Sequence, residues 1–213
     1  SLVGSEMCIR DRYMVVPCYN EQEVLPETSK RLLEKLQSLV LKNKIADNSR
    51  IMFVNDGSKD QTWSMIKGLC EENSVFAGVN LSRNRGHQNA LLAGMATAVK
   101  YADMIVTMDA DLQDPPMLLP EMLRIIREEQ YDSVATRRVT RKGEPQIRSF
   151  CARQFYHIMN KISDVELMDG ARDYRFMTRK YVNAVLSLKE FNRFSKGIFG
   201  SVSYTHLRAH ETS

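Results

Sequence analysis

The chain has 213 residues, of which 43% are hydrophobic and 26% are charged, a composition typical of a folded protein rather than a disordered one. It contains no uncharged apolar run of the roughly 18–20 residues that a membrane-spanning helix requires. Residues 1–136 carry 15 basic and 19 acidic side chains, a net charge of −4, whereas residues 137–213 carry 15 and 7, a net charge of +8. This asymmetry favours metal binding in the first part and contact with anions in the second.

The two ends of the chain lack the pattern of a folded element. Residues 1–12 and 201–213 show neither a helical nor a strand period, and residues 1–12 also lack the long apolar segment of a signal peptide. We interpret both ends as non-native sequence that lies outside the fold. An α/β core is then expected over residues 13–136, and residues 137–200 form a further part of the same domain.

From residue 13 onward, short apolar runs alternate with helical patterns. The runs are rich in β-branched residues and stop at polar clusters, as buried strands do. They cover residues 13–18, 50–55, 75–81, 103–108 and 131–136. Apolar side chains at helical spacing lie between them and predict helices over 25–39, 63–70, 90–98 and 118–126. This alternation predicts an α/β fold, a Rossmann-like and mainly parallel sheet flanked by helices.

The pattern changes after about residue 137. We expect an amphipathic helix over roughly 147–162, then a short strand over 174–178 and a helix over 179–188. The four cysteines have no metal-binding spacing and are expected to be free thiols in a reducing compartment.

Four polar clusters follow predicted strands. They are PCYNE at 17–21, NDGSKD at 55–60, SRNRGHQ at 82–88 and DADLQD at 109–114. Parallel sheets bind ligands beyond the carboxyl ends of their strands, at the point where the strand order reverses. We therefore expect the four clusters to form one site.

The acidic cluster after the fourth strand is the strongest of these signals. Asp109 and Asp111 flank the small Ala110, and in an extended segment residues i and i+2 point the same way. Two converging carboxylates suit Mg²⁺, which takes few protein oxygens together with substrate phosphates. The alternative is a solvated acidic turn that opens a helix. An EF-hand is excluded because Asp114 stands where that loop needs glycine, and no histidine or cysteine lies nearby for zinc.

The other clusters allow two interpretations each. Asp56 can accept hydrogen bonds from a base or ribose, and Gly57 permits a sharp turn, but plain turn chemistry also explains them. Tyr19 offers a stacking face and Glu21 an acceptor. The loop 82–87 can hold a phosphate on its arginines and on the amides of a helix N-terminus, or it can be a solvated loop.

His87, at the end of that loop, is expected to be structural or exposed rather than catalytic. Neither a GxGxxG loop nor a GxxxxGK[ST] loop is present in the chain.

Taken together, these motifs resemble the GT-A glycosyltransferases of family 2, over roughly residues 13–200. DADLQDPP closely matches the DxD motif of that family, and NDGSKD resembles its DDGS-type turn with Asn55 in place of the first Asp. SRNRGHQNALLAG is similar to the SRNFGKxAALxAG segment of the polyprenyl-phosphate branch. DGARDYRFMTR resembles the GDFRLxxR motif of that branch, with Arg172 where Gly is usual and Tyr174 where Phe is usual, and NRFSKG resembles its RFxxG segment.

The resemblance implies an inverting, metal-dependent hexosyltransferase that moves a hexose from a UDP- or GDP-sugar to a polyprenyl phosphate acceptor. Residues 13–136 would then form the nucleotide-sugar-binding core, and residues 137–200 the acceptor-binding and membrane-proximal part. Two alternatives stay open: transfer to a saccharide hydroxyl, and a nucleotide-sugar-binding fragment without turnover. The absence of a QxxRW motif disfavours polysaccharide polymerisation. A nucleotidyltransferase is disfavoured because the chain has no Gly-rich phosphate loop near its start.

The resemblance also assigns roles to individual residues. Nucleotide-sugar binding falls to Pro17, Tyr19, Glu21, Asp56, Arg83 and Asp109. Asp111 and Gln113 would hold Mg²⁺ or Mn²⁺, Asp173 would be the base or orienting carboxylate, and Arg175 would contact a phosphate. The basic second part would supply acceptor-phosphate contacts from Arg137, Arg153 and Arg193, because arginine forks suit phosphate oxygens.

The expected surroundings of the protein follow from the same resemblance. The segment 189–200 mixes aromatic and cationic residues, as an interfacial element does, so the membrane surface is an expected partner. We expect a parent protein at the cytoplasmic face of a membrane, anchored beyond the C-terminal end of this sequence. No nucleic-acid partner is expected, and homo-oligomerisation stays open, as do the sugar and the base.

Overall fold

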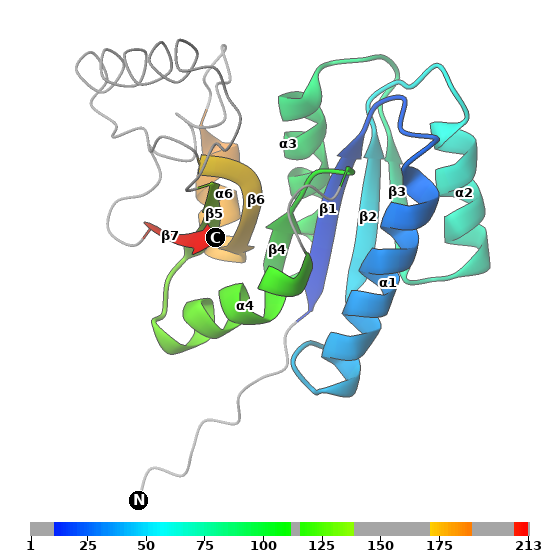
Figure 1. The fold of residues 1–213 in the computed structure, drawn as a ribbon. Helices are drawn as coiled ribbons and strands as arrows, with labels where there is room; N and C mark the ends of the chain where they lie inside the picture. The colour runs from blue at the N-terminus through cyan, green and yellow to red at the C-terminus, as the bar shows by residue number, and fades with distance from the viewer. Residues whose placement is uncertain (1–10, 112–115, 139–170, 189–206, 213) are drawn as a thin grey trace, which may run out of the picture.

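The computed structural model describes residues 11–111, 116–138, 171–188 and 207–212, and these build one seven-stranded sheet (Figure 1). The strand order is β3-β2-β1-β4-β6-β5-β7. The strands are β1 (Arg12–Cys18), β2 (Arg50–Asn55), β3 (Phe76–Asn80), β4 (Met104–Thr107), β5 (Ser133–Arg138), β6 (Ala171–Thr178) and β7 (Leu207–Thr212). Every strand predicted from the apolar runs is therefore present, and the predicted α/β fold is confirmed.

The direction of the strands divides the sheet into two parts. β3, β2, β1 and β4 are parallel, whereas β6 runs antiparallel to both β4 and β5. β2 and β3 lie in order on one side of β1, and the next strand in the chain, β4, lies on the other side of β1. Connections therefore leave β1 and β4 in opposite directions, which opens a crevice at their carboxyl ends.

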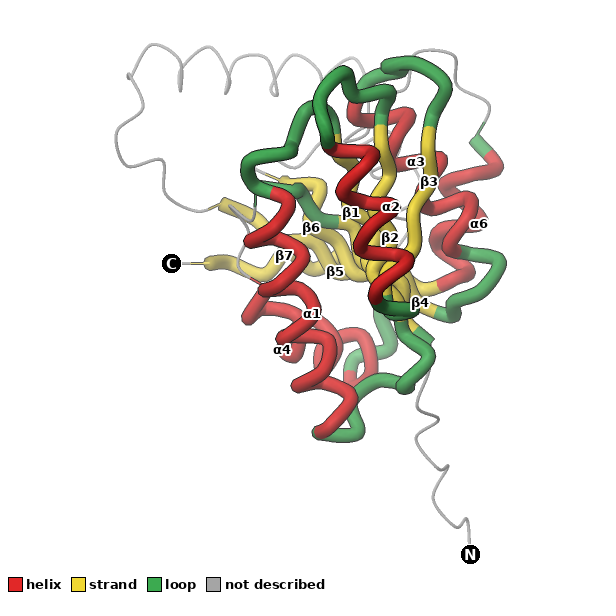
Figure 2. Tube along the Cα trace, turned by 90° about the vertical axis from the view of Figure 1, so that its right-hand side faces the viewer, coloured by secondary structure: helices red, strands yellow, loops and turns green. Residues whose placement is uncertain are grey.

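Helices cover both faces of the sheet. The helices are α1 (Leu25–Leu41), α2 (Thr62–Glu72), α3 (His87–Ala98), the short 3₁₀ helix η1 (Pro116–Leu118), α4 (Leu119–Glu128) and α6 (Arg179–Ser187). Figure 2 shows α1 and α4 on one side of the strands and α3 and α6 on the other. Each face has its own buried apolar cluster, one around Phe53, Leu32 and Met122 and the other around Val54, Met95 and Val182.

Helix α3 lies very close to the sheet. Ala90, Gly94 and Ala98 form a face of small residues on this helix, and all three are buried. A Cβ atom on Gly94 would collide with the side chain of Val15 and come 2.7 Å from that of Val54. The absence of a side chain at Gly94 therefore sets how closely α3 approaches β1 and β2.

The alternation of side chains along β4 prepares the site. Met104 and Val106 face the α1 side, and Ile105 faces the α3 side. Met108 and Ala110 continue on the α1 side beyond the end of the strand. Asp109, between them, lies toward the N-terminus of α3, where its Oδ1 is 3.5 Å from His87 Nε2.

The expectation that residues 201–213 lie outside the fold is wrong for six of these thirteen residues. Leu207–Thr212 form β7, which pairs in parallel with Ser133–Arg138 of β5. An edge strand offers a full row of backbone donors and acceptors, so a segment without apolar alternation still pairs with it. The predicted helix over 147–162 lies outside the described residues. Whether either end is native sequence stays a prediction.

Two further expectations concern the membrane and the cysteines. Within the ranges that the structure describes, no helix has both the length and the apolar character needed to cross a bilayer. Cys18 and Cys70 are free thiols, as predicted. Burial raises the pKa of Cys18 far above its ordinary value, so this thiol is protonated and unreactive at neutral pH.

Candidate active site

The loops that follow β1 and β2 are joined by hydrogen bonds. The Asp56 amide donates to the Cys18 carbonyl at 2.9 Å, and the Asn20 amide donates to Ser58 Oγ at 3.0 Å. In the reverse direction, the Lys59 amide donates to Asn20 Oδ1 at 2.9 Å. Asn20 has a φ of 56°, a left-handed conformation that asparagine adopts more readily than most residues. These bonds hold the first two polar clusters together, as predicted.

The predicted nucleotide-binding residues of the first cluster differ in accessibility. Tyr19 is 41% exposed, so its ring is available for stacking. Glu21 is half-buried, and its amide donates to Thr62 Oγ1 at 2.8 Å. Pro17 is buried within β1, where it pairs with Val54. Pro17 therefore shapes the strand end and presents no open surface for a nucleotide.

Asp56 connects the second cluster to the third. It is only 2% exposed, and its Oδ1 and Oδ2 accept hydrogen bonds from the amides of Arg85 at 2.7 Å and Gly86 at 2.9 Å. Gly57 has a φ of +66°, and a Cβ there would lie 2.5 Å from the backbone of Arg83 and Asn84. Asp56 and Gly57 together fix the loop before α3, on which Arg83 is exposed. A contact of Asp56 with the nucleotide stays a prediction.

The third and fourth clusters meet at β6. In the ladder between β4 and β6, Thr107 pairs with Arg175, and extending this antiparallel register by two residues brings Asp109 opposite Asp173. Thr107 Oγ1 also donates to the carbonyl oxygen of Asp173 at 2.5 Å. Two predicted site residues from distant parts of the sequence therefore lie side by side.

His87 lies between these two carboxylates. Its Nε2 is 3.5 Å from Asp109 Oδ1 and 3.4 Å from Asp173 Oδ2. Gln88 Nε2 donates to the same Oδ2 of Asp173 at 3.3 Å. The first turn of α3 thus contacts the ends of both β4 and β6.

The ionisation of this group reflects its contacts. The hydrogen bond to Asp173 raises the pKa of His87, burial opposes the rise, and the charges of Asp109, Asp173 and Asp56 add to it. For Asp173, burial alone would raise the pKa, but the contacts with His87 and Gln88 and the charge of Arg175 outweigh it, so the pKa lies below its ordinary value. The arrangement therefore favours an imidazolium between two carboxylates.

A second concentration of negative charge lies where β1 and β4 end. Burial raises the pKa of Glu21 most, and the charges of Asp111, Asp60 and Asp109 raise it further. Asp111 is exposed, and Thr28 Oγ1 holds its turn by donating to the Ala110 carbonyl at 2.5 Å. The prediction that residues 109–111 are extended is wrong, because β4 ends at Thr107 and a turn includes Ala110 and Asp111.

This acidic region fits a divalent cation that takes few ligands from the protein. A cation would relieve the repulsion that raises the pKa of Glu21. Among the described residues, no group of three or more histidine, cysteine or carboxylate side chains is arranged to enclose a metal ion. A metal at Asp111 would therefore complete its shell from other oxygens, as Mg²⁺ does with substrate phosphates. The second predicted ligand, Gln113, lies outside the described residues.

The predicted phosphate-binding arginines are placed less favourably. Arg175 is 3% exposed, and burial lowers its pKa against the opposing charges of Tyr181 and Asp173. Its guanidinium is buried on β6 in the neighbourhood of Tyr181 and Asp173. Arg137 lies on β5, where its backbone pairs with Ala171, and Arg153 and Arg193 lie outside the described residues. Their roles stay predictions.

His87 is the residue that reasoning from the sequence missed. It was expected to be structural or exposed, and its side chain is indeed 42% exposed, yet it contacts two predicted site carboxylates. The available signal was its position at the start of a helix that follows a strand of the parallel sheet. Its contact with Asp173 depends on the antiparallel placement of β6, which no local pattern reveals.

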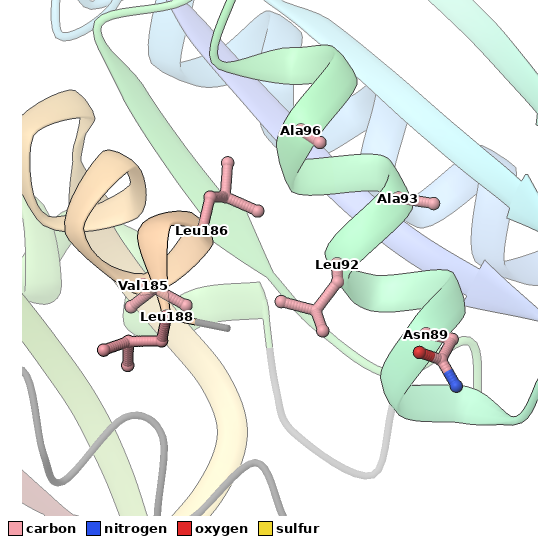
Figure 3. A pocket seen from close by; sticks show the side chains of 7 residues that line it. All are labelled: Asn89, Leu92, Ala93, Ala96, Val185, Leu186 and Leu188. Carbon is pink, nitrogen blue, oxygen red and sulfur yellow. The ribbon is translucent and has the colours of Figure 1, made fainter. Parts of the chain in front are cut away.

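Two hollows lie near these residues. One, of about 440 Å³, is lined by polar residues of the first two loops, among them Glu21, Lys59 and Asp60. The other, of about 350 Å³, is an apolar groove between α3 and α6, shown in Figure 3 with Leu92 directed toward the α6 side. Asn89, at the lower end of α3 in that view, directly follows Gln88, which contacts Asp173. The polar hollow adjoins the candidate site through Glu21.

Comparison with known proteins agrees with this geometry. The family model described as "Glycosyl transferase family 2" matches residues 13–186. The chain is 39% identical to the uncharacterized glycosyltransferase sll0501 of Synechocystis sp., over 90% of this chain and 57% of that protein. It is 34% identical to the prophage bactoprenol glucosyl transferase homolog of Escherichia coli K12, over 89% of this chain and 59% of that protein. The chain thus spans little more than half the length of these relatives.

A solved structure extends the comparison to the fold. The mannosyltransferase PcManGT of Pyrobaculum calidifontis, determined in complex with GDP-Man and Mn²⁺, superposes with a TM-score of 0.59 at 17% identity. The match covers 90% of this chain and 51% of that one. The GT-A fold expected from the sequence motifs is confirmed.

Proposed function

Because the chain belongs to glycosyl transferase family 2, we propose that it transfers a hexose from a UDP- or GDP-sugar to a polyprenyl phosphate, with inversion and with a divalent metal. The observation that carries the proposal is the meeting of Asp109 and Asp173 beside the acidic ends of β1 and β4. In this proposal Asp109 serves the donor and Asp173 the acceptor, at the point where the strand order reverses.

The donor occupies the ends of β1 and β2 in this proposal. Tyr19 stacks on the base, and Arg83, on the loop that Asp56 holds, contacts the phosphates. Asp111 and Gln113 hold Mg²⁺ or Mn²⁺. The metal, when bound, neutralises the charge that develops on the diphosphate leaving group.

The acceptor approaches from the side of Asp173. A phosphate oxygen of the lipid donates an electron pair to the anomeric carbon and forms a new carbon–oxygen bond on the face opposite the diphosphate. The bond between the anomeric carbon and the donor phosphate oxygen breaks, and the electron pair leaves with the nucleoside diphosphate. A phosphate monoester is already ionised near neutral pH, since its second pKa is about 6, so no proton has to be removed. Asp173 therefore orients the acceptor side rather than acting as an obligatory base.

Relatives support the two substrate classes in different ways. The name of the Escherichia coli relative supports bactoprenol phosphate, a polyprenyl phosphate, as the type of acceptor. The complex of the Pyrobaculum calidifontis enzyme with GDP-Man and Mn²⁺ supports a nucleotide-sugar donor and a divalent metal.

The test is direct transfer of label. The chain is incubated with radiolabelled UDP-glucose or GDP-mannose, Mg²⁺ and polyprenyl phosphate in detergent, and labelled lipid is extracted. We expect labelled lipid with one donor and none with EDTA. Asp111→Asn should lower the rate at least about 100-fold, in the range found when a key electrostatic contact is lost.

The control carries the same chemical change away from the site. Asp47 is exposed in the connection between α1 and β2, so Asp47→Asn should retain full activity. Full activity of Asp111→Asn would remove the metal role, and label found on a saccharide instead of the lipid would favour a hydroxyl acceptor.

A further inference from the structure

His87 contacts both Asp109 and Asp173, and the transfer described above gives it no role. It is the first residue of α3, and its Nε2 lies within 3.5 Å of an oxygen of each carboxylate. The charged groups that face it come from three strands: Asp56 after β2, Asp109 after β4 and Asp173 on β6. The imidazole therefore lies at the boundary between the donor-side and acceptor-side residues.

The two carboxylates need such a partner. Asp109 and Asp173 are opposite each other by the register of β4 and β6, and like charges at this spacing repel. Thr107 holds the backbone of Asp173 at its carbonyl oxygen, and this bond does not by itself prevent rotation of the side chain away from Asp109. Contacts from His87 and Gln88 to the same Oδ2 oppose that rotation.

We propose that His87 is a positioning residue that holds the Asp173 carboxylate beside Asp109 before the acceptor binds. The inference rests on the proposed function, because it assigns Asp173 to the acceptor side. Contacts of this kind are often long in the absence of substrates and shorten in the reactive complex, so separations of 3.4–3.5 Å suit this role. Loss of the contact leaves the donor site in place and disturbs the geometry of transfer, so the expected loss is in kcat rather than in the KM of the donor.

Two substitutions separate the role of the cation from that of the ring. His87→Leu removes the charge and the donor, whereas His87→Lys retains both. We expect His87→Leu to lower kcat at least about tenfold with the donor KM changed less than about threefold, and His87→Lys to retain kcat within about threefold. Lys67 is exposed on α2, on the face of the sheet opposite α3, so Lys67→Leu is the matched control and should have the kcat and the donor KM of the wild type. Unchanged kcat in His87→Leu, equal losses in both His87 variants, or a loss confined to the donor KM would overturn the proposal.

A second measurement needs no turnover. The His87 imidazole is titrated by NMR in the wild type, in Asp173→Asn and in Asp47→Asn. We expect its pKa to fall in Asp173→Asn, because a carboxylate partner is lost, and to be unchanged in Asp47→Asn. A His87 pKa that is the same in Asp173→Asn as in the wild type would show that the two side chains are not in contact. If the wild type transfers no sugar while this pKa shift is present, the proposed function fails and the contact between His87 and Asp173 stands.

Discussion

Asp109 and Asp173 lie close together, each with an oxygen within 3.5 Å of His87 Nε2, although Asp109 follows a strand of the parallel core and Asp173 belongs to the antiparallel strand inserted next to it. The pairing of Thr107 with Arg175 sets this relationship, and the bond from Thr107 to the Asp173 carbonyl reinforces it. The position of Asp173 is therefore set by backbone pairing, and Asp109 lies two residues beyond the last paired residue of β4.

Substitution of Asp173 should separate catalysis from donor binding. Asp173→Asn keeps the shape of the side chain but removes its charge, and the donor-side residues Tyr19, Arg83 and Asp111 remain in place. We expect a loss in kcat of about 10²-fold or more, with the donor dissociation constant from calorimetry changed less than about threefold. A large loss of donor affinity with little effect on kcat would show that Asp173 serves the donor.

Asp56 should be important for stability as well as for binding. Asp56→Ala removes the carboxylate that accepts from the amides of Arg85 and Gly86, of which Gly86 retains Asn84 Oδ1 at 3.1 Å, and we expect it to lower the free energy of unfolding by about 1–3 kcal/mol. Urea denaturation measures the change, with exposed Asp47→Ala as the control. Equal stability of the two variants would contradict the importance of these bonds.

Substitution of two glycines by alanine should change the free energy of unfolding in opposite directions. Gly57→Ala forces a side chain into a left-handed conformation and against the backbone of Arg83 and Asn84, so we expect destabilisation of about 1–3 kcal/mol. Gly68, inside α2, has open space around the position of a Cβ, and Gly68→Ala should stabilise by about 0.5–1 kcal/mol. Both values come from chemical denaturation. An unchanged free energy of unfolding in Gly57→Ala would mean that the backbone of Arg83 and Asn84 moves away from the new side chain at little cost.

The contact between His87 and Asp173 predicts a pH dependence of stability. The raised pKa of His87 gives stability below its unfolded pKa of about 6.5, which is lost as the pH rises through the folded pKa. The lowered pKa of Asp173 gives stability above its unfolded pKa of about 3.9, which is lost as the pH falls through the folded pKa. The contact is therefore most stabilising between about pH 4 and about pH 6.5.

The difference in unfolding free energy between the wild type and His87→Leu should accordingly be larger at about pH 5.5 than at about pH 8.5. Because the His87 side chain is 42% exposed, the pH-dependent part should stay below about 1 kcal/mol. Lys67→Leu should show the same difference from wild type at both pH values. A difference for His87→Leu that grows toward alkaline pH would contradict the sign.

Local patterns predicted most of the fold because its central strands contain short, buried apolar runs such as residues 51–54 of β2. The same patterns were misleading where the conformation or pairing of a segment depends on the backbone and not on its side chains. The turn at Ala110 and Asp111 interrupts the alternation expected there, and β7 pairs without an apolar pattern. His87 was missed, and Arg175 was expected at a phosphate although it is buried, because both depend on where β6 enters the sheet.

The insertion of β6 between β4 and β5 has a consequence for how such an enzyme can change its specificity. The strand that carries Asp173 comes from the later part of the sequence, but it supplies backbone partners to two strands from the earlier part. A shortened chain that ends at β5 would leave β4 and β5 with unpaired strand edges. We therefore expect that neither the part before β6 nor the part from β6 onward folds alone, and that neither can be exchanged as a module. Specificity for a new acceptor is more easily gained by substitutions in the loops next to β6 than by exchange of whole segments of the chain.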